Sequence, residues 1–251
     1  MIIDFHGHSD MYEAYGWFDP PEQVVRLMDR AGIDMTCITT YGEAPMYPVA
    51  ISLLVDYVKR FPDRLIGFAR IHPGGGPDAV AAVEEAAKYP DQIKGIKLHP
   101  VCTLQKPYGR LSVEVIKKAA EFGLPVFSHC CDKVGSQPWQ VGFGAQAVPE
   151  AIIICHMGGF FHGEEAIRMA KACPNVYLDT SSIPYPGIVK KAIEELGPDR
   201  VLFATDNPAG DPVSDLAKVT QLGLDEDTLE KVLWKNAARL MNLKEVRGVA
   251  V

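Results

Sequence analysis

Two histidines near the start of the chain have the spacing of a metal-ligand pair. His6 and His8 follow the apolar opening Met1-Ile2-Ile3, within the motif Asp4-Phe5-His6-Gly7-His8. In an extended strand, residues two apart project from the same face, so both imidazoles would point to one place. Imidazole nitrogens are common ligands of first-row transition metals. The pair alone is a weak signal, and it predicts a metal site only if other segments supply further ligands.

Most of the other histidines stand at the ends of short apolar runs. Such runs begin near residues 2, 34, 65, 95, 124, 152, 176 and 201. The polar residues at or just past the ends of the later runs are Glu43, Arg70, His72, Lys97, His99, His129, His156, Asp179 and Asp206. Six of the seven histidines are placed at run ends, His162 being the exception, whereas a random distribution would scatter them over helices and loops.

The runs are spaced as strands that alternate with helices. Successive runs begin roughly 24 to 32 residues apart, which is the length of one strand, one helix and two loops. The helices expected from their end signals are 19–32, closed by Gly32, then 77–89, 113–122 with Ser112 as its cap, 163–172, 186–196, 213–222 and 225–242. The pattern predicts one α/β domain over residues 1–251, a single (β/α)8 TIM barrel. An open doubly wound sheet is the alternative, but no G-x-G-x-x-G follows the first strand.

In such a barrel, the carboxyl ends of all strands meet at the face where active sites lie. Strands 1, 5 and 8 surround the barrel mouth, and strands 1 and 8 are neighbours. The predicted ligands from these strands are His6, His8, His129 and Asp206. Three imidazoles and one carboxylate suit Zn²⁺, Mn²⁺ or Fe²⁺ and leave a position for water. Alternatively, each residue is an ordinary polar group satisfied at a strand end.

Five motifs give the chain a specific resemblance. They are Asp4-Phe5-His6-Gly7-His8, Gly95-Ile96-Lys97-Leu98-His99-Pro100, Phe127-Ser128-His129, Cys155-His156-Met157-Gly158-Gly159 and Ala204-Thr205-Asp206-Asn207-Pro208. In this order they resemble the amidohydrolase superfamily, and within it the amidohydrolase-2 branch that includes the aminocarboxymuconate-semialdehyde decarboxylases and related hydrolases. The segment 233–240 resembles the closing helix of that family. The resemblance implies one divalent metal on the four predicted ligands, with His156 beside the metal. Members of this branch are often longer than this chain.

Lys97 alternates with Ile96 and Leu98, so it should point into the barrel. A buried ammonium must be paired, be neutral or be modified. It would bind a substrate carboxylate or a developing oxyanion, or pair with Glu43 or Asp179. In other amidohydrolase branches the strand-4 lysine is carboxylated and bridges two metals. We favour the ammonium and a single metal, most simply Zn²⁺.

The predicted chemistry is hydrolysis of a small-molecule amide, lactone or related carbonyl bond. A bound divalent ion makes hydroxide available near pH 7; Asp206 would take the proton from the water, and His156 would stabilise the oxyanion. The alternative is non-oxidative decarboxylation of an unsaturated or aromatic acid on the same residues. Expected substrate-binding residues are Arg70, Lys97, His99 and Trp139. Trp139 falls in the longest rim loop, 130–144, and Tyr12, Tyr15 and Trp17 follow strand 1, which suggests a flat or partly apolar substrate.

Other classes of protein account for fewer of the residues named above. PHP-type phosphoesterases resemble the chain only over residues 4–9 and need further ligands for two or three metals. TatD-like nucleases usually have a glutamate where Lys97 stands. A barrel that binds metal without turnover is the non-enzyme alternative, although no expected ligand is missing.

The composition of the chain limits the kinds of binding partner that are expected. A net charge of -7 and a pI near 5.5 argue against nucleic acid or anionic membrane as the main partner. Neither a secretory signal pattern nor an apolar stretch of about 20 residues is found, so a cytoplasmic protein with free thiols is expected. The expected partner is a small-molecule substrate, and the chain is a possible homo-oligomer.

Overall fold

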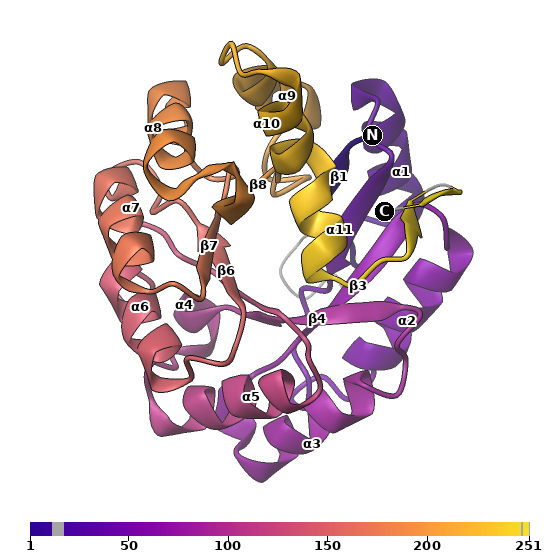
Figure 1. Cartoon of the computed structure of the whole chain (residues 1–251). Helices are drawn as coiled ribbons and strands as arrows, with labels where there is room; N and C mark the ends of the chain where they lie inside the picture. Colours follow the sequence, from indigo (N-terminus) through magenta and orange to yellow (C-terminus); the bar gives the residue numbers. More distant parts are fainter. Residues whose placement is uncertain (12–17, 247, 251) are drawn as a thin grey trace.

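The computed structural model describes residues 1–11, 18–246 and 248–250. Within these residues, eight parallel strands form one curved sheet, in which they follow one another in sequence order (Figure 1). The strands are β1 (Ile3–His8), β2 (Met35–Thr39), β3 (Leu65–Arg70), β4 (Ile93–Leu98), β5 (Val126–Ser128), β6 (Ile153–His156), β7 (Val176–Asp179) and β8 (Val201–Leu202). Nearly all their residues are buried, which is why they read as continuous apolar runs.

The segment after β8 closes the sheet onto β1. β8 itself has only two residues, but the chain continues along β1. The amide of Phe5 donates to the carbonyl of Phe203 at 2.9 Å, the amide of Asp206 donates to that of His6 at 2.8 Å, and the amide of His8 donates to that of Asn207 at 2.6 Å. We call residues 203–207 and their β1 partners the seam. The predicted barrel is confirmed, and the open doubly wound sheet is wrong.

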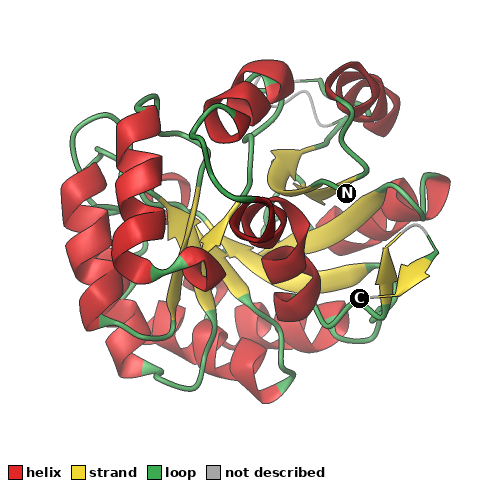
Figure 2. Cartoon of the chain, turned by 45° about the horizontal axis from the view of Figure 1, so that its top comes forward, coloured by secondary structure: helices red, strands yellow, loops and turns green. Residues whose placement is uncertain are grey.

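Helices surround the strands, as Figure 2 shows from a second direction. They are α1 (Pro21–Ala31), α2 (Ala50–Arg60), α3 (Pro77–Ala86), α4 (Pro100–Thr103), α5 (Arg110–Glu121), α6 (Pro138–Ala147), α7 (Gly163–Ala172), α8 (Pro186–Leu196), α9 (Pro212–Thr220), α10 (Glu226–Glu230) and α11 (Asn236–Leu240). Short turns η2 (Pro73–Gly75) and η3 (Pro198–Arg200), a π-helical segment η4 (Lys231–Lys235), and a small antiparallel pair β9 (Glu245–Val246) and β10 (Val249–Ala250) complete the described elements. No described helix is long and apolar enough to cross a membrane.

Helix ends follow their local signals in most cases. Gly32 ends α1 in the left-handed conformation at φ +73°, where its amide bonds the carbonyls of Met28 and Asp29. The predicted spans 163–172 and 186–196 are confirmed. The predicted cap Ser112 is wrong, since α5 begins at Arg110 and Ser112 lies buried inside it. The predicted helix 225–242 is divided by the π-helical segment η4.

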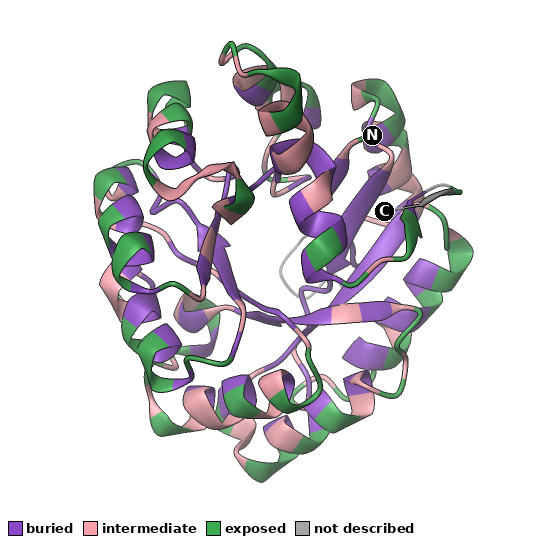
Figure 3. Cartoon of the chain, viewed as in Figure 1, coloured by how far each residue is buried: buried purple, intermediate pink, exposed green. Residues whose placement is uncertain are grey.

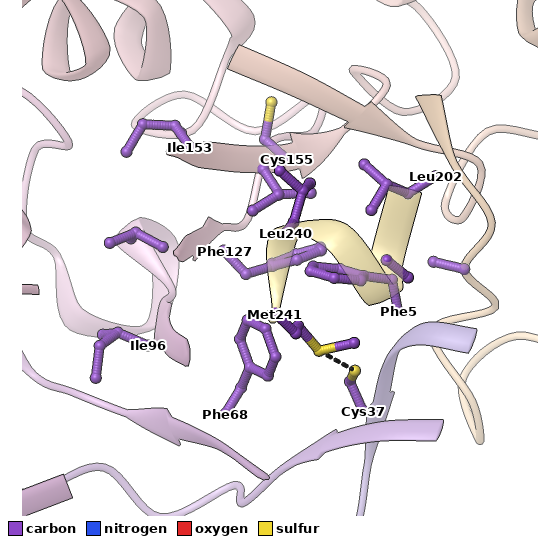
Figure 4. Packing of buried hydrophobic residues seen from close by; sticks show 14 of the residues in the cluster. Phe5, Cys37, Phe68, Ile96, Phe127, Ile153, Cys155, Leu202, Leu240 and Met241 are labelled. Carbon is purple, nitrogen blue, oxygen red and sulfur yellow. Dashed lines mark hydrogen bonds between the residues drawn. The ribbon is translucent and has the colours of Figure 1, made fainter. Parts of the chain in front are cut away.

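Buried residues make up most of the strands and alternate with exposed ones along the surrounding helices (Figure 3). Phe5 lies edge-on to Phe68 with ring centroids 5.3 Å apart. The end of α11 reaches the same cluster, where Leu240 and Met241 are packed (Figure 4). The Cys37 thiol donates to Met241 Sδ at 3.4 Å. The last helix therefore contributes side chains to the packing of the strands that carry the site.

Candidate metal and substrate site

Two strand-end histidines converge on one carboxylate oxygen at the seam. His6 Nε2 and His8 Nε2 each lie 3.1 Å from Asp206 Oδ1. Gly7 allows the close approach, because a Cβ there would lie 3.1 Å from the Asn207 carbonyl oxygen. Asp206 itself has φ +57°, a left-handed conformation that aspartate tolerates better than most residues. The seam thus places side chains of residues 200 positions apart on a single point.

Asp4, the first residue of the opening motif, joins β1 to the seam. Its carboxylate accepts bonds from the Thr205 amide at 2.9 Å and from Thr205 Oγ1 at 2.6 Å. The side chain is fully buried, and burial raises the pKa of Asp4 to about 8. Asp4 is therefore a positioning residue for Asp206, the neighbour of Thr205.

The donor atoms fit a divalent cation. Lys97 Nζ lies 3.1 Å from His6 Nε2, and a single Nε2 cannot both accept a proton from Lys97 and donate one to Asp206. Ligand atoms bound to one ion at about 2.0–2.2 Å are separated by roughly 3.0–3.5 Å. The 3.1 Å separations of both histidine nitrogens from Asp206 Oδ1 match that spacing. Lone pairs crowded in this way are typical of residues arranged around a metal ion.

The charge states of these groups also suit a metal. Burial lowers the pKa of His6 and of His8, which keeps both imidazoles neutral. Burial acts to raise the pKa of Asp206, but the bonds from His6 and His8 outweigh it and hold that pKa well below its usual value. Burial lowers the pKa of Lys97 to about 7, against the opposing pull of Asp206.

His156 is held by a hydrogen-bonded pair of side chains. Its Nδ1 lies 3.1 Å from Asp179 Oδ2 and 2.9 Å from Ser181 Oγ, and Ser181 Oγ donates to Asp179 Oδ1 at 2.7 Å. These contacts place the proton on Nδ1 and leave the lone pair on Nε2. His156 Nε2 is buried and has no hydrogen-bond partner among the described residues. Ligand atoms of His6, His156 and Asp206 lie within 4.8 Å of one another.

His129 borders this group through ring contacts. Its ring lies 5.1 Å from that of His156 and stacks on His99 with centroids 4.1 Å apart. Burial lowers the pKa of His129, and the nearby His156 lowers it further. His99 Nδ1 accepts the amide of Cys102 at 3.2 Å. The geometry thus sets His156 at least as close to the His6–Asp206 pair as the sequence-based ligand His129.

A cavity of about 430 Å³ opens at the carboxyl ends of the strands, and we call it the first cavity. It is lined by His8, Asp19, Tyr41, Arg70, Lys97, His99, Cys102, His129, Asp206, Pro208 and Ala209. Arg70 is buried, and its Nε donates to Glu43 Oε1 at 2.7 Å. Lys97 Nζ lies 3.9 Å from the centre of the Phe127 ring. Two buried basic side chains, Arg70 and Lys97, therefore stand beside the His/Asp cluster.

Some sequence expectations need correction. Trp139 was expected over the metal, but it lies on α6, where it packs against Phe143 and lines neither this cavity nor the seam. The alternative role of Lys97, an ion pair with Glu43 or Asp179, is not seen among the described residues, where these carboxylates bind Arg70 and His156 instead. His72 accepts the amide of Gly74 as a turn cap. Tyr12, Tyr15 and Trp17 lie outside the described residues.

Two residues of the site escaped the sequence reasoning. Tyr41 stacks on His8 with ring centroids 5.0 Å apart, and its hydroxyl donates to Asp19 Oδ2 at 2.9 Å. Ser181 links His156 to Asp179. Tyr41 and Ser181 each follow a strand by two residues, so the rule that selected the strand-end residues would have found them had it been extended slightly.

The comparisons with known proteins agree with this architecture. The sequence profile of a family described as amidohydrolase matches residues 3–243. No curated protein matches the chain. Among solved structures, 2,6-dihydroxybenzoate decarboxylase from Rhizobium is similar at 17% identity, with a TM-score of 0.75 over 97% of this chain and 99% of that one.

Two further structures are similar over almost their whole length. 5-Carboxyvanillate decarboxylase from Sphingomonas paucimobilis has 15% identity and a TM-score of 0.75, covering 96% of this chain and 98% of that one. Dihydroxybenzoic acid decarboxylase from Polaromonas, with bound manganese and the inhibitor 2-nitroresorcinol, has 17% identity and a TM-score of 0.78 over 97% of each chain. At these identities, the structural likeness establishes the barrel fold.

Proposed function

The chain belongs to the amidohydrolase family, and from that membership we propose that it is a metal-dependent, non-oxidative decarboxylase of an aromatic or unsaturated carboxylic acid. The observation that carries the proposal is the lining of the first cavity. Buried Arg70 and Lys97 face the space beside the cluster of His6, His8 and Asp206. A cationic wall next to a cation-binding cluster suits a substrate that carries a carboxylate.

One divalent ion would be held by His6, His8, His129 and Asp206, with His156 beside it. The ion supplies positive charge that binds substrate oxygen and stabilises the negative charge of the transition state. Nitrogen and carboxylate donors suit Zn²⁺, which the sequence favours, and also Mn²⁺, which the Polaromonas relative contains. The 4.8 Å grouping also allows His156 to replace His129 as a ligand.

The side chains of this site have distinct tasks in the reaction. Arg70, fixed by Glu43, would orient the substrate carboxylate, and Lys97 would bind a neighbouring oxygen. His156 would first take up a proton from solvent on Nε2, whose lone pair has no partner among the described residues, and would then pass it to the ring carbon that bears the carboxylate, while Asp179 holds the Nδ1 proton. The carbon–carbon bond then breaks, its electron pair returns to the ring, and carbon dioxide leaves. Proton and electrons balance without an oxidant.

Hydrolysis, the first expectation from the sequence, uses the same residues. Decarboxylation is better supported because the solved structures named above, similar over nearly the entire chain, are decarboxylases of aromatic acids. The cationic lining of the first cavity is a second reason, because a neutral amide or lactone does not require Arg70.

The proposal is tested with protein reconstituted with Mn²⁺ or Zn²⁺. We expect carbon dioxide release from 2,6-dihydroxybenzoate or 5-carboxyvanillate, and a KM for the active acid that rises about 10- to 100-fold in Arg70→Lys, because a lysine cannot reproduce the bidentate contact. Arg26→Lys, an exposed arginine on α1, is the matched control. Turnover of amides or lactones without carbon dioxide release from any acid would establish the hydrolase instead.

A further inference from the structure

A second cavity, of about 690 Å³, adjoins the first on the other side of Asp206. It is lined by residues of the loops that follow β6, β7 and β8 and of the helix α9. The residues used below are Phe160, Ser182, Ile183, Asp215, Ala217 and Lys218. It is larger than the first cavity, and the reaction proposed above leaves it without a role.

One carboxylate separates the two cavities. Asp206 and Ala209 line both of them. Asp206 Oδ1 faces His6 and His8, whereas Asp206 Oδ2 accepts a hydrogen bond at 3.1 Å from Ser182 Oγ, a group of the second cavity. Ser182 also has a left-handed backbone, with φ +55°. A ligand beside the metal-binding cluster is thus within the width of one side chain of the second cavity.

The second cavity differs chemically from the first. Its two most enclosed charges neutralise each other, since Lys218 Nζ lies 2.6 Å from Asp215 Oδ1 and donates to the Ile183 carbonyl at 2.9 Å. Their side chains are 10% and 15% exposed. Phe160, Ile183 and two prolines form the larger, apolar part of the remaining wall, and its polar part comes from uncharged side chains such as Ser182, Ser214 and Gln221. The space therefore favours an uncharged, mainly apolar group, whereas the first cavity favours an anion.

From this adjacency we propose that the substrate has two parts. Its acidic ring occupies the first cavity, and an uncharged, apolar substituent on the ring extends past Asp206 into the second. The substrate class is then a carboxylic acid with an aryl or alkyl substituent. This inference rests on the proposed decarboxylase function and adds the specificity of the same site.

The test compares binding of salicylate with that of 4-phenylsalicylate and 5-phenylsalicylate to the Mn²⁺-loaded protein by calorimetry. At least one of the two phenyl-substituted acids should bind about tenfold tighter than salicylate. This factor corresponds to about 1.4 kcal/mol of binding free energy. A carboxylate on the added phenyl ring should abolish the gain, because the second cavity has no cation in its described lining that is not already neutralised.

Variants of α9 assign the gain to the second cavity. Ala217→Phe fills this space. In this variant, the tenfold ratio between the dissociation constants of salicylate and of the tighter-binding phenyl acid should fall to about one. Ser214→Phe, at an exposed lining position, gives the same result if Ala217→Phe is poorly folded. Ala81→Phe, the same substitution on an exposed face of α3, should keep the tenfold ratio.

The outcomes separate the inference from the function on which it rests. If salicylate binds but neither phenyl acid binds tighter, or if the gain survives in both α9 variants, the inference is wrong and the decarboxylase function stands. If no acid binds to the wild-type protein, the proposed function fails, and the two-part substrate fails with it.

Discussion

Asp206 belongs to three features of the site: the His/Asp cluster, the seam, and the wall between the two cavities. Its role as a ligand is best tested with Asp206→Asn, because asparagine also accepts the left-handed backbone that Asp206 adopts. We expect wild-type protein purified without chelator to contain about one divalent metal per chain. Asp206→Asn should lose most of that metal, because a neutral amide is a weaker ligand than a carboxylate. Elemental analysis measures both.

Asp56→Asn, on an exposed position of α2, is the matched control and should retain its metal. Full metal content in Asp206→Asn would exclude Asp206 as a ligand. Two metals per chain with bicarbonate-dependent reconstitution would favour a carboxylated Lys97 over the ammonium.

His156 provides the proton in the proposed reaction. Replacing it with alanine should preserve metal content but lower kcat by about 10² to 10⁴, the range of a positioned acid–base group. Asp179→Asn should lower kcat by about 10- to 100-fold, because the imidazole loses the partner that fixes its tautomer. Metal analysis and steady-state kinetics of both variants are the measurements, with His162→Ala as the control. Loss of metal in His156→Ala would make His156 a direct ligand.

Much of the site was predictable residue by residue, because the ends of parallel strands meet at one face. That rule alone selected Arg70, Lys97 and His99, which line the first cavity. The contact between His156 and Asp179 was not predictable, since it depends on the distance between two strand ends and on the side-chain rotamers. Trp139 was misplaced for another reason, because its surrounding glycines and glutamines gave no sign of a helix.

At the scale of elements, the residue that ends α11 packs into the core of the barrel. Met241 is 3% exposed and packs beside Phe68 and Cys37 (Figure 4). Met241→Ala should lower the free energy of unfolding by about 2–5 kcal/mol, through lost burial and the cavity left behind. Urea denaturation measures the change. Met46→Ala, at a side chain 58% exposed, should change it by less than about 0.5 kcal/mol. Equal effects of the two variants would contradict the packing role.

Most helices with familiar signals at their ends were predicted from the sequence, but α2 and α6 were missed. Gly32 and the prolines that begin α1 and α8 are local signals that the structure confirms. α2 was missed because Val49 precedes it and offers no side-chain cap. α6 was missed because its apolar residues do not gather on one face, and its cap is a pair of glutamines, Gln137 and Gln140. Packing against the barrel, rather than local propensity, accounts for both helices.

At the scale of the whole molecule, the proposed metal would stabilise the closed barrel. Ligand binding at about 1,000 times its Kd adds about 4 kcal/mol to stability. For a protein of this size, each kcal/mol changes Tm by about 2–4 °C, so a chelator should lower Tm by roughly 8–16 °C. Differential scanning calorimetry with and without EDTA tests this. Asp206→Asn should show no shift, and an unchanged wild-type Tm would argue against a tightly held metal.

The seam has a consequence for biosynthesis. His6 leaves the ribosome 200 residues before Asp206, so no nascent fragment that ends before Asp206 contains a complete set of donors. Contacts this distant in sequence form late, because a long loop must close first. Metal capture therefore requires closure of the seam and distinguishes chains that contain it from chains truncated before it. Stalled chains should stay metal-free even in a cell rich in manganese or zinc.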